Sequence, residues 1–234
     1  MVRLRHGRAV PSRHRRSCVV GAIAAAALGA FPAPAVADDN WVQPGQVMTL
    51  IPSDDEVSGY AGMPMSSTGP VSMVPAPPER LRQRDDCRAF YEVGTTELVG
   101  SNYASHRWQR WENRSQDAAA VVAVTTFPSV AEADAAFTNT YNRPAIDRCR
   151  NARLAGADVD PGVTMDLVHI ESNPDARVIS WLLSARHNGA NMGFTSAFLV
   201  AVGANFMIEV MTSQWGNAAV TMDRLSQHVL DRVH

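Results

Sequence analysis

Residues 119–137 read AAVVAVTTFPSVAEADAAF, and this stretch decides the fold because it holds a strand and the start of a helix. Residues 119–127 are apolar and β-branched, a pattern typical of a strand in the middle of a sheet. Pro128 ends the run, and Ser129 followed three positions later by Glu132 forms a capping-box pattern. The sequence therefore predicts a central strand that leads directly into a helix.

The helix after Ser129 is expected to bury one face, whose members recur at helical spacing: Val130, Ala133, Phe137 and Tyr141. Pro144 should bend or interrupt this helix before Cys149, because proline lacks the backbone N–H and clashes with the preceding turn.

Downstream of Cys149, residues 163–170, 177–187 and 194–202 are strand candidates. Gly203-Ala204-Asn205 is a turn that leads into a further strand at 206–212, which makes the last pair a hairpin. Asn217 is predicted to cap a terminal helix, whose buried positions would be Met222, Leu225, Val229 and Val233.

Upstream, residues 38–48 are expected to form an extended leader. Ser53 and Glu56 form a first capping box, which predicts a short helix ending near Gly59 or Gly62. The proline-rich residues 63–79 are expected to form a loop. Short strands are predicted at 90–93, 97–101 and 106–111, with a turn at 112–117. Together these elements indicate one α+β domain over 49–234, a twisted antiparallel sheet with helices packed on it.

The first 37 residues have the features of a signal peptide. An arginine-rich segment precedes an alanine-rich apolar stretch at 19–31, and Ala35-Val36-Ala37 fits a cleavage site. The apolar stretch is shorter than the ~20 residues that span a bilayer. Cleavage would leave a protein with no membrane span, either secreted or located in the extracytoplasmic cell envelope.

Signal cleavage also changes the net charge. Six of the 21 basic residues lie in residues 1–37 while all 23 acidic residues follow, which leaves a net charge of −8. A domain of this charge has no basic field for nucleic acid or anionic membrane surfaces, so neither is expected as a partner.

Two cysteines, Cys87 and Cys149, remain after cleavage, because Cys18 lies within residues 1–37. They are 62 positions apart (149 − 87), and an oxidising compartment favours a disulfide between them. The alternative is a pair of unpaired buried thiols. A metal site would need more ligands nearby.

No catalytic motif is present: the chain has no G-x-S-x-G, H-E-x-x-H or C-x-x-C sequence. The mature histidines lack metal-ligand spacing, and they are His106, His169, His187, His228 and His234. Asp158 and Asp160 offer too few oxygen ligands for calcium and are better explained by a turn. We therefore expect a protein that is not an enzyme, with no cofactor and no bound metal.

The most distinctive polar and aromatic residues are Arg107, Trp108, Arg110 and Trp111. On a strand, Arg107 and Trp111 share one face while Trp108 and Arg110 share the other, so one tryptophan would join the core and the other would meet a ligand. Arginine beside tryptophan can hold a carboxylate, a phosphate or a sugar face. The alternative is an ordinary amphipathic edge strand.

Several segments together resemble the PknH-like extracellular sensor domain of mycobacterial receptor kinases and its stand-alone exported relatives. They are the helix region at 50–63, Cys87, the stretch AVVAVTTFPSVAEADAAF at 120–137, Cys149, the hairpin AFLVAVGANFMIEVMTS at 197–213 and a final helix ending in DRV. The resemblance covers most of 50–233. One departure is that a second cysteine pair of the family would fall at Ser196 and Ser213.

The resemblance implies a twisted antiparallel sheet with helices and a cleft that binds an unidentified ligand. Two functions follow as hypotheses. The first is a sensor or ligand-binding domain of the envelope that takes a small molecule in a pocket. The second is a module that docks on another envelope protein, which would show an exposed apolar patch instead.

Overall fold

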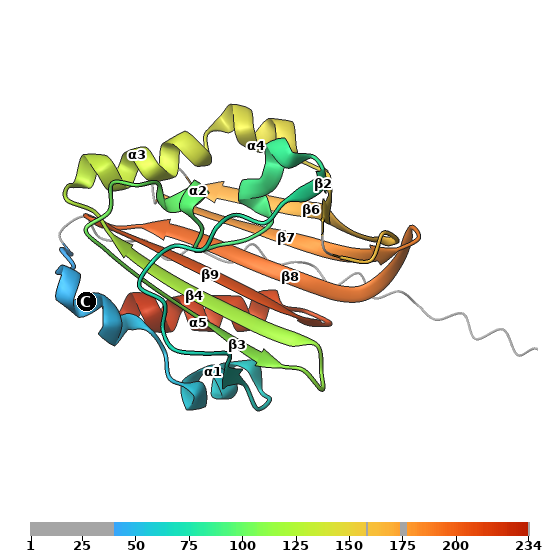
Figure 1. Ribbon diagram of the computed structural model, residues 1–234, viewed down its shortest axis with the longest axis horizontal. Coiled ribbons are helices and arrows are strands. Elements are labelled where there is room, and N and C mark those ends of the chain that lie inside the picture. Colours follow the sequence, from blue (N-terminus) through green and yellow to red (C-terminus); the bar gives the residue numbers. More distant parts are fainter. Residues whose placement is uncertain (1–39, 158, 174–176, 234) are drawn as a thin grey trace, which may run out of the picture. The chain divides into compact units, whose positions relative to one another are not determined.

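The computed structural model describes residues 40–157, 159–173 and 177–233, which form a nine-stranded sheet flanked by helices (Figure 1). The strand order is β1-β3-β4-β9-β8-β7-β6-β5-β2, and every neighbouring pair is antiparallel. The predicted signal peptide at 1–37, Asp158 and His234 lie outside the described residues. The α+β class and the antiparallel sheet are confirmed.

The strands have the following bounds: β1 (Ser66–Ser67), β2 (Leu81–Gln83), β3 (Ser105–Asn113), β4 (Ala118–Thr126), β5 (Arg153–Gly156), β6 (Val163–Asn173), β7 (Val178–His187), β8 (Ala190–Val202) and β9 (Phe206–Trp215). The helices are η1 (Pro44–Leu50), α1 (Asp54–Ala61), η2 (Asp85–Phe90), α2 (Thr96–Val99), α3 (Val130–Thr140), α4 (Arg143–Cys149) and α5 (Ala219–Asp231), of which η1 and η2 are 3-10 helices. Among the described helices, none is long and apolar enough to cross a bilayer.

Helices cover both faces of the sheet (Figure 1). On one face, which we call the α5 face, η1, α1 and α5 pack over a core that includes Trp111, Val122, Leu199, Ile208 and Leu225. On the other, which we call the disulfide face, η2, α2, α3 and α4 pack over Phe90, Leu167, Trp181, Phe198 and Met207. Alternate residues of each central strand enter the two cores, as the period of two requires.

The stretch at 119–137 folds as predicted. β4 lies between β3 and β9, and its residues 121–126 are buried, because both faces of the sheet are covered. Ser129 caps α3, since its hydroxyl accepts from the Glu132 backbone N–H at 3.3 Å. The Glu132 carboxylate bonds the Ser129 hydroxyl rather than its backbone N–H, so the capping box is only half formed.

One residue of the face of α3 that was predicted to be buried is exposed. Ala133, Phe137 and Tyr141 are buried as predicted, but Val130 is exposed because it lies in the first turn, beyond the edge of the sheet contact. Pro144 stands at the beginning of α4 and separates it from α3, which confirms the predicted interruption.

The β8–β9 hairpin is confirmed. A Cβ atom at Gly203 would lie 2.2 Å from the Phe206 ring, so the turn requires glycine at this position. The buried amide of Asn205 holds the N-terminal segment, because it accepts from the Val42 backbone N–H at 2.8 Å and donates to the Val42 carbonyl at 2.9 Å. The turn thus ties the segment before η1 to the central sheet.

We expect Asn205→Ala to lower the free energy of unfolding by about 2 kcal/mol, since both backbone groups of Val42 would lose a buried partner. Urea unfolding followed by tryptophan fluorescence measures this. Asn139→Ala, at an exposed position of α3 whose side chain makes no such contact, serves as the control. A loss for Asn205→Ala no larger than that of the control would contradict the role of the turn.

Several predictions for individual segments of the chain are wrong. Residues 44–48 of the predicted extended leader belong to η1, which continues to Leu50, because Val47 and Leu50 are buried against the α5 face. The predicted strands at 90–93 and 97–101 are instead the end of η2 and the short helix α2. The short strands β1, β2 and β5 were not predicted. Asn217 accepts from the Ala219 N–H at 3.0 Å, but the residue at the cap position is Ala218.

Candidate functional site

A cavity of about 600 Å³ opens on the disulfide face of the sheet. Its floor consists of residues from six strands: Arg110 and Glu112 of β3, Ala119 of β4, Met165 of β6, Leu183 and Ala185 of β7, Ser196 and Phe198 of β8, and Met211 and Ser213 of β9. Glu79, Tyr91, Glu92 and Val159 form a wall beside this floor. The size and the largely apolar lining are those of a small-molecule site.

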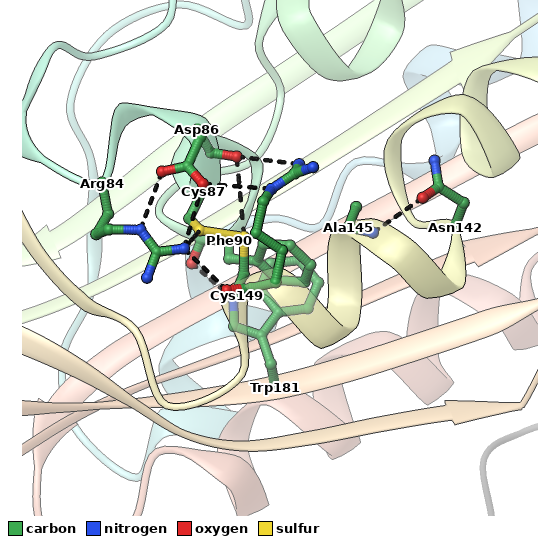
Figure 2. The surroundings of a disulfide bond; sticks show 9 residues. Arg84, Asp86, Cys87, Phe90, Asn142, Ala145, Cys149 and Trp181 are labelled. Atoms are coloured by element: carbon green, nitrogen blue, oxygen red, sulfur yellow. Dashed lines mark hydrogen bonds and ion pairs between the residues drawn. A yellow bond between two sulfur atoms is a disulfide. The ribbon is translucent and has the colours of Figure 1, made fainter.

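The disulfide holds the wall of the cavity in place. Cys87 in η2 and Cys149 in α4 are bonded, with sulfur atoms 2.15 Å and Cα atoms 5.6 Å apart, as the sequence predicted. Tyr91 and Glu92 follow η2 directly. Beneath the bond, the Trp181 indole N–H donates to the Phe90 carbonyl at 2.8 Å, which fixes the end of η2 on the sheet (Figure 2).

Trp181 also joins the disulfide region to the cavity floor. Its ring stacks on Phe198, with centroids 5.0 Å apart and planes 5° from parallel. Phe198 itself lines the cavity. A continuous series of contacts thus runs from Phe90 at the end of η2 through Trp181 to Phe198 at the floor of the cavity.

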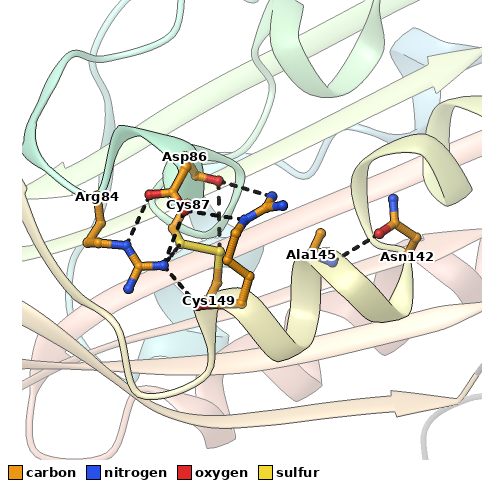
Figure 3. Close-up of polar contacts among 7 residues, drawn as sticks. Arg84, Asp86, Cys87, Asn142, Ala145 and Cys149 are labelled. Carbon is orange, nitrogen blue, oxygen red and sulfur yellow. Dashed lines mark hydrogen bonds and ion pairs between the residues drawn. A yellow bond between two sulfur atoms is a disulfide. The ribbon is translucent and has the colours of Figure 1, made fainter.

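A polar cluster covers the outer side of the disulfide. The Arg84 guanidinium bonds Asp86 at 3.0 Å and lies 3.1 Å from the Cys87 sulfur (Figure 3). Arg148 pairs with the same carboxylate at 3.2 Å. The hydrogen bond from Arg84 is the main reason that the pKa of Asp86 lies below its usual value. These contacts hold η2 against α4 independently of the covalent bond.

The only group of metal-ligating side chains among the described residues is Asp86, Cys87 and Cys149. Because the two sulfur atoms are bonded to each other, neither is free as a thiolate to bind a metal. Two guanidinium groups already pair with the Asp86 carboxylate. These three residues therefore form the disulfide and the ion pairs beside it.

Oxygen atoms gather at the wall of the cavity. Glu92 Oε1 accepts from the Glu79 backbone N–H at 2.5 Å. A Cβ atom at Gly156 would lie 2.6 Å from Glu79 Oε1 and 2.8 Å from the Tyr91 hydroxyl, so these two oxygen atoms converge over one backbone position. Burial raises the pKa of Glu92 to about 7 and that of Tyr91 to about 12, and the nearby Glu79 carboxylate adds to both shifts.

Arginines occupy the part of the cavity formed by β3 and the turn after it. Arg110 donates to Glu112 at 2.7 Å, and Arg114 donates to the other oxygen of the same carboxylate at 3.2 Å. The hydrogen bond from Arg110 is the main cause that lowers the pKa of Glu112. The two guanidinium groups thus share one carboxylate.

The predicted ligand residues are separated by the sheet. Trp111 is 1% exposed in the core of the α5 face, and its indole N–H bonds Asp54 at 2.8 Å. Arg107 bonds Ser105 and the His106 carbonyl. Trp108 packs on the disulfide face beneath the 72–74 loop, where its indole N–H donates to the Val74 carbonyl. Of the four, only Arg110 lines the cavity.

Ser196 and Ser213 are directly opposite each other on β8 and β9, with hydroxyl oxygens 2.7 Å apart. Both line the cavity, so the position at which the resemblance would place a second cysteine pair is part of the cleft. Sequence reasoning missed Glu79, Tyr91 and Glu92. No motif marks them, because the cleft wall is formed by irregular chain between short elements.

Two buried titratable groups lie on the disulfide face but do not line the cavity. Glu209 on β9 is fully buried, and its Oε2 accepts from the Gly94 N–H at 2.8 Å, while Oε1 has no partner among the described residues. Burial raises the pKa of Glu209 to about 7. His106 bonds Thr125 at 2.8 Å, and burial lowers its pKa to about 4.

A known protein structure shares this architecture. The extracellular domain of PknH from Mycobacterium tuberculosis superposes with a TM-score of 0.70 at 13% identity, covering 82% of this chain and 96% of that one. A protein from Mycobacterium smegmatis described as uncharacterized gives a TM-score of 0.41 at 14% identity, covering 78% of this chain and 97% of that one. Among curated proteins, none matches the chain. The family model for the PknH-like extracellular domain matches residues 42–232, and the chain therefore belongs to the family of PknH-like extracellular domains.

Proposed function

We propose that this protein is an exported, non-enzymatic sensor domain of the cell envelope that binds a small molecule in the cleft on the disulfide face. The family is one of extracellular domains, which supports an extracytoplasmic location. The disulfide suits the same location, because such bonds persist in oxidising compartments. The predicted signal peptide at 1–37 would provide the route of export.

The observation that carries the proposal is the cavity of about 600 Å³. It combines an apolar floor with polar groups concentrated at its wall and at β3, which is the usual composition of a small-molecule site. Three methionines line it, Met165, Met192 and Met211, and such flexible side chains can adapt to a ligand.

Docking on another envelope protein is the second candidate. Met73 and Val74 are adjacent on the loop that covers Trp108, and they are 63% and 62% exposed. Two exposed apolar residues are a much smaller surface than a stable protein interface needs. The cleft therefore supports the small-molecule function better.

A thermal-shift screen of envelope extracts tests the proposal. A ligand that binds only the folded protein must raise the melting temperature by mass action. We expect at least one small-molecule fraction to do so, and we expect Ala119→Trp, which fills the floor of the cleft, to abolish the shift. Ala190→Trp, at an exposed position outside the cleft, should leave it unchanged.

If no small-molecule fraction shifts the melting temperature, the proposal is wrong. Retention of one envelope protein on the immobilised domain, with binding lost in Met73→Asp, would then favour docking.

A further inference from the structure

We propose that the cleft selects ligands that carry a protonated amine on an apolar body, with the amine held at the wall formed by Glu79, Tyr91 and Glu92. This inference rests on the proposed function and specifies its ligand class. It reverses the charge expected from the sequence, in which the arginines and tryptophans of β3 would hold an anion or a sugar.

The balance of charge in the cleft is the first argument. The acidic side chains that line it are Glu79, Glu92, Glu112 and Asp117, whereas the basic ones are Arg110 and Arg114. Both guanidinium groups are already paired with Glu112, which leaves little positive charge for an anion. An ionised cleft thus has a net charge of −2, and a cationic ligand would neutralise it.

The arrangement of acceptors at the wall is the second argument. Glu92 uses one oxygen to accept from the Glu79 N–H, and its other oxygen has no hydrogen-bond partner among the described residues. Glu79 Oε1 and the Tyr91 hydroxyl face the same backbone position at Gly156. An ammonium group has three donors and no acceptor, so it matches a wall of carboxylate and phenol oxygens. The aromatic ring of Tyr91 can add a cation–π contact.

An organic cation fits this wall better than a metal ion. Within the described part of the chain, Glu79 and Glu92 belong to no group of three side chains with ligand atoms within 4.8 Å of one another. Calcium needs six to eight oxygen ligands, more than this wall provides. The floor beside it is apolar, with Leu183, Phe198 and Met211, and would bury a hydrocarbon or aromatic body.

Protonation of Glu92 should make the affinity for the ligand depend on pH. Burial is the largest cause that places its pKa at about 7; Glu79 in the preceding loop and Glu97 in α2 raise it further, and Arg88 in η2 lowers it. A cationic ligand binds the ionised form of Glu92, so the affinity for the amine should fall as the pH falls below 7. Glu209 titrates in the same range beneath the neighbouring Gly94, so a variant of Glu92 is needed to separate the two.

The test compares three probes of equal chain length, decylamine, decanol and decanoate, by titration calorimetry on the purified protein at pH 8. We expect decylamine to bind at least tenfold more tightly than the other two. Glu92→Gln should weaken decylamine binding about tenfold, because it removes a charge-assisted contact. Glu171→Gln, the same change at a position outside the cleft, should have no effect.

The same titration at pH 6 should give about tenfold weaker binding of decylamine to the parent protein, and a smaller change in Glu92→Gln. Glu79→Gln provides a second variant if Glu92→Gln does not fold. Equal or tighter binding of decanoate or decanol would overturn the amine assignment while leaving a small-molecule cleft intact. No binding of any of the three would also overturn it, and the extract screen would then decide the proposed function separately.

Discussion

Replacing Cys149 with serine is expected to lower the free energy of unfolding by about 4 kcal/mol. The disulfide closes a loop across a sequence separation of 62, and the chain-entropy model assigns a loop of this length about that stabilisation, because the cross-link restricts the unfolded chain. The bond also joins η2 to α4 above a fully buried core, so the unpaired thiol of Cys87 would gain no compensating contact with solvent.

Urea unfolding of the parent and of Cys149→Ser measures this difference directly. The double variant Cys87→Ser, Cys149→Ser is the control, since it removes the bond without leaving a free thiol, and both variants should lose similar stability. The ion pairs of Asp86 with Arg84 and Arg148 remain in both. A loss below 1 kcal/mol, or recovery of Cys87 and Cys149 as free thiols from non-reduced protein, would contradict this prediction.

The second large effect is expected from Glu209→Gln. Burial raises the pKa of Glu209 in the folded protein to about 7, above the value of 4.5 that applies to an unperturbed glutamate. The folded state therefore binds this proton more tightly than the unfolded state does. Below pH 4.5 the group costs no stability; between pH 4.5 and 7 stability falls as the pH rises, and above pH 7 the full cost remains. The shift corresponds to a cost of about 3 kcal/mol.

Glutamine carries no titrating proton, so the free energy of unfolding of Glu209→Gln should change by about 3 kcal/mol less between pH 5 and pH 8 than that of the parent. Its amide oxygen can still accept from the Gly94 N–H. His106 acts in the opposite direction, since its lowered pKa makes stability rise with pH between about 4 and 6.5, but it is present in both proteins. Urea unfolding at several pH values measures the difference, and parallel pH profiles for the two proteins would show that Glu209 is not the titrating group.

The elements that were predictable from sequence are those in which local and tertiary signals agree. The stretch at 119–137 combines strand propensity with a helix cap. At the β8–β9 hairpin, Gly203-Ala204-Asn205 is a turn sequence, and the Phe206 ring leaves no room for a Cβ atom at Gly203. Cys87 and Cys149 are the two cysteines that follow the predicted signal peptide, so their number alone indicates that they pair. In each case the residue type itself indicates the local structure or the covalent bond.

Other parts depended on contacts that the sequence does not display. The apolar residues Phe90, Leu98 and Val99 suggested strands, yet they belong to η2 and α2, which bury them against the disulfide face. In these two segments, packing against the sheet determined the secondary structure, although the local sequence pattern indicated strands. The candidate site shows a related limit: alternation on β3 places Trp108 and Trp111 on opposite faces, but only the fold shows that Trp111 is buried in the core of the α5 face and that the 72–74 loop covers Trp108.

The cleft wall illustrates the same limit. Glu79 and Glu92 are thirteen positions apart and look like ordinary surface acids in the sequence. Their meeting depends on the disulfide, which holds η2 over the sheet, and on the Trp181 bond to the Phe90 carbonyl. The two cysteines are visible in the sequence, but the meeting of Glu79 and Glu92 that depends on their bond is not.

The central claim is that the cleft on the disulfide face holds a small molecule, and native mass spectrometry of the protein after incubation with envelope extract tests it most directly. We predict a small-molecule adduct on the parent and on Ala190→Trp, and its loss from Ala119→Trp, in which the floor of the cleft is filled. An adduct that persists in Ala119→Trp, or the absence of any adduct from the parent, would contradict the account.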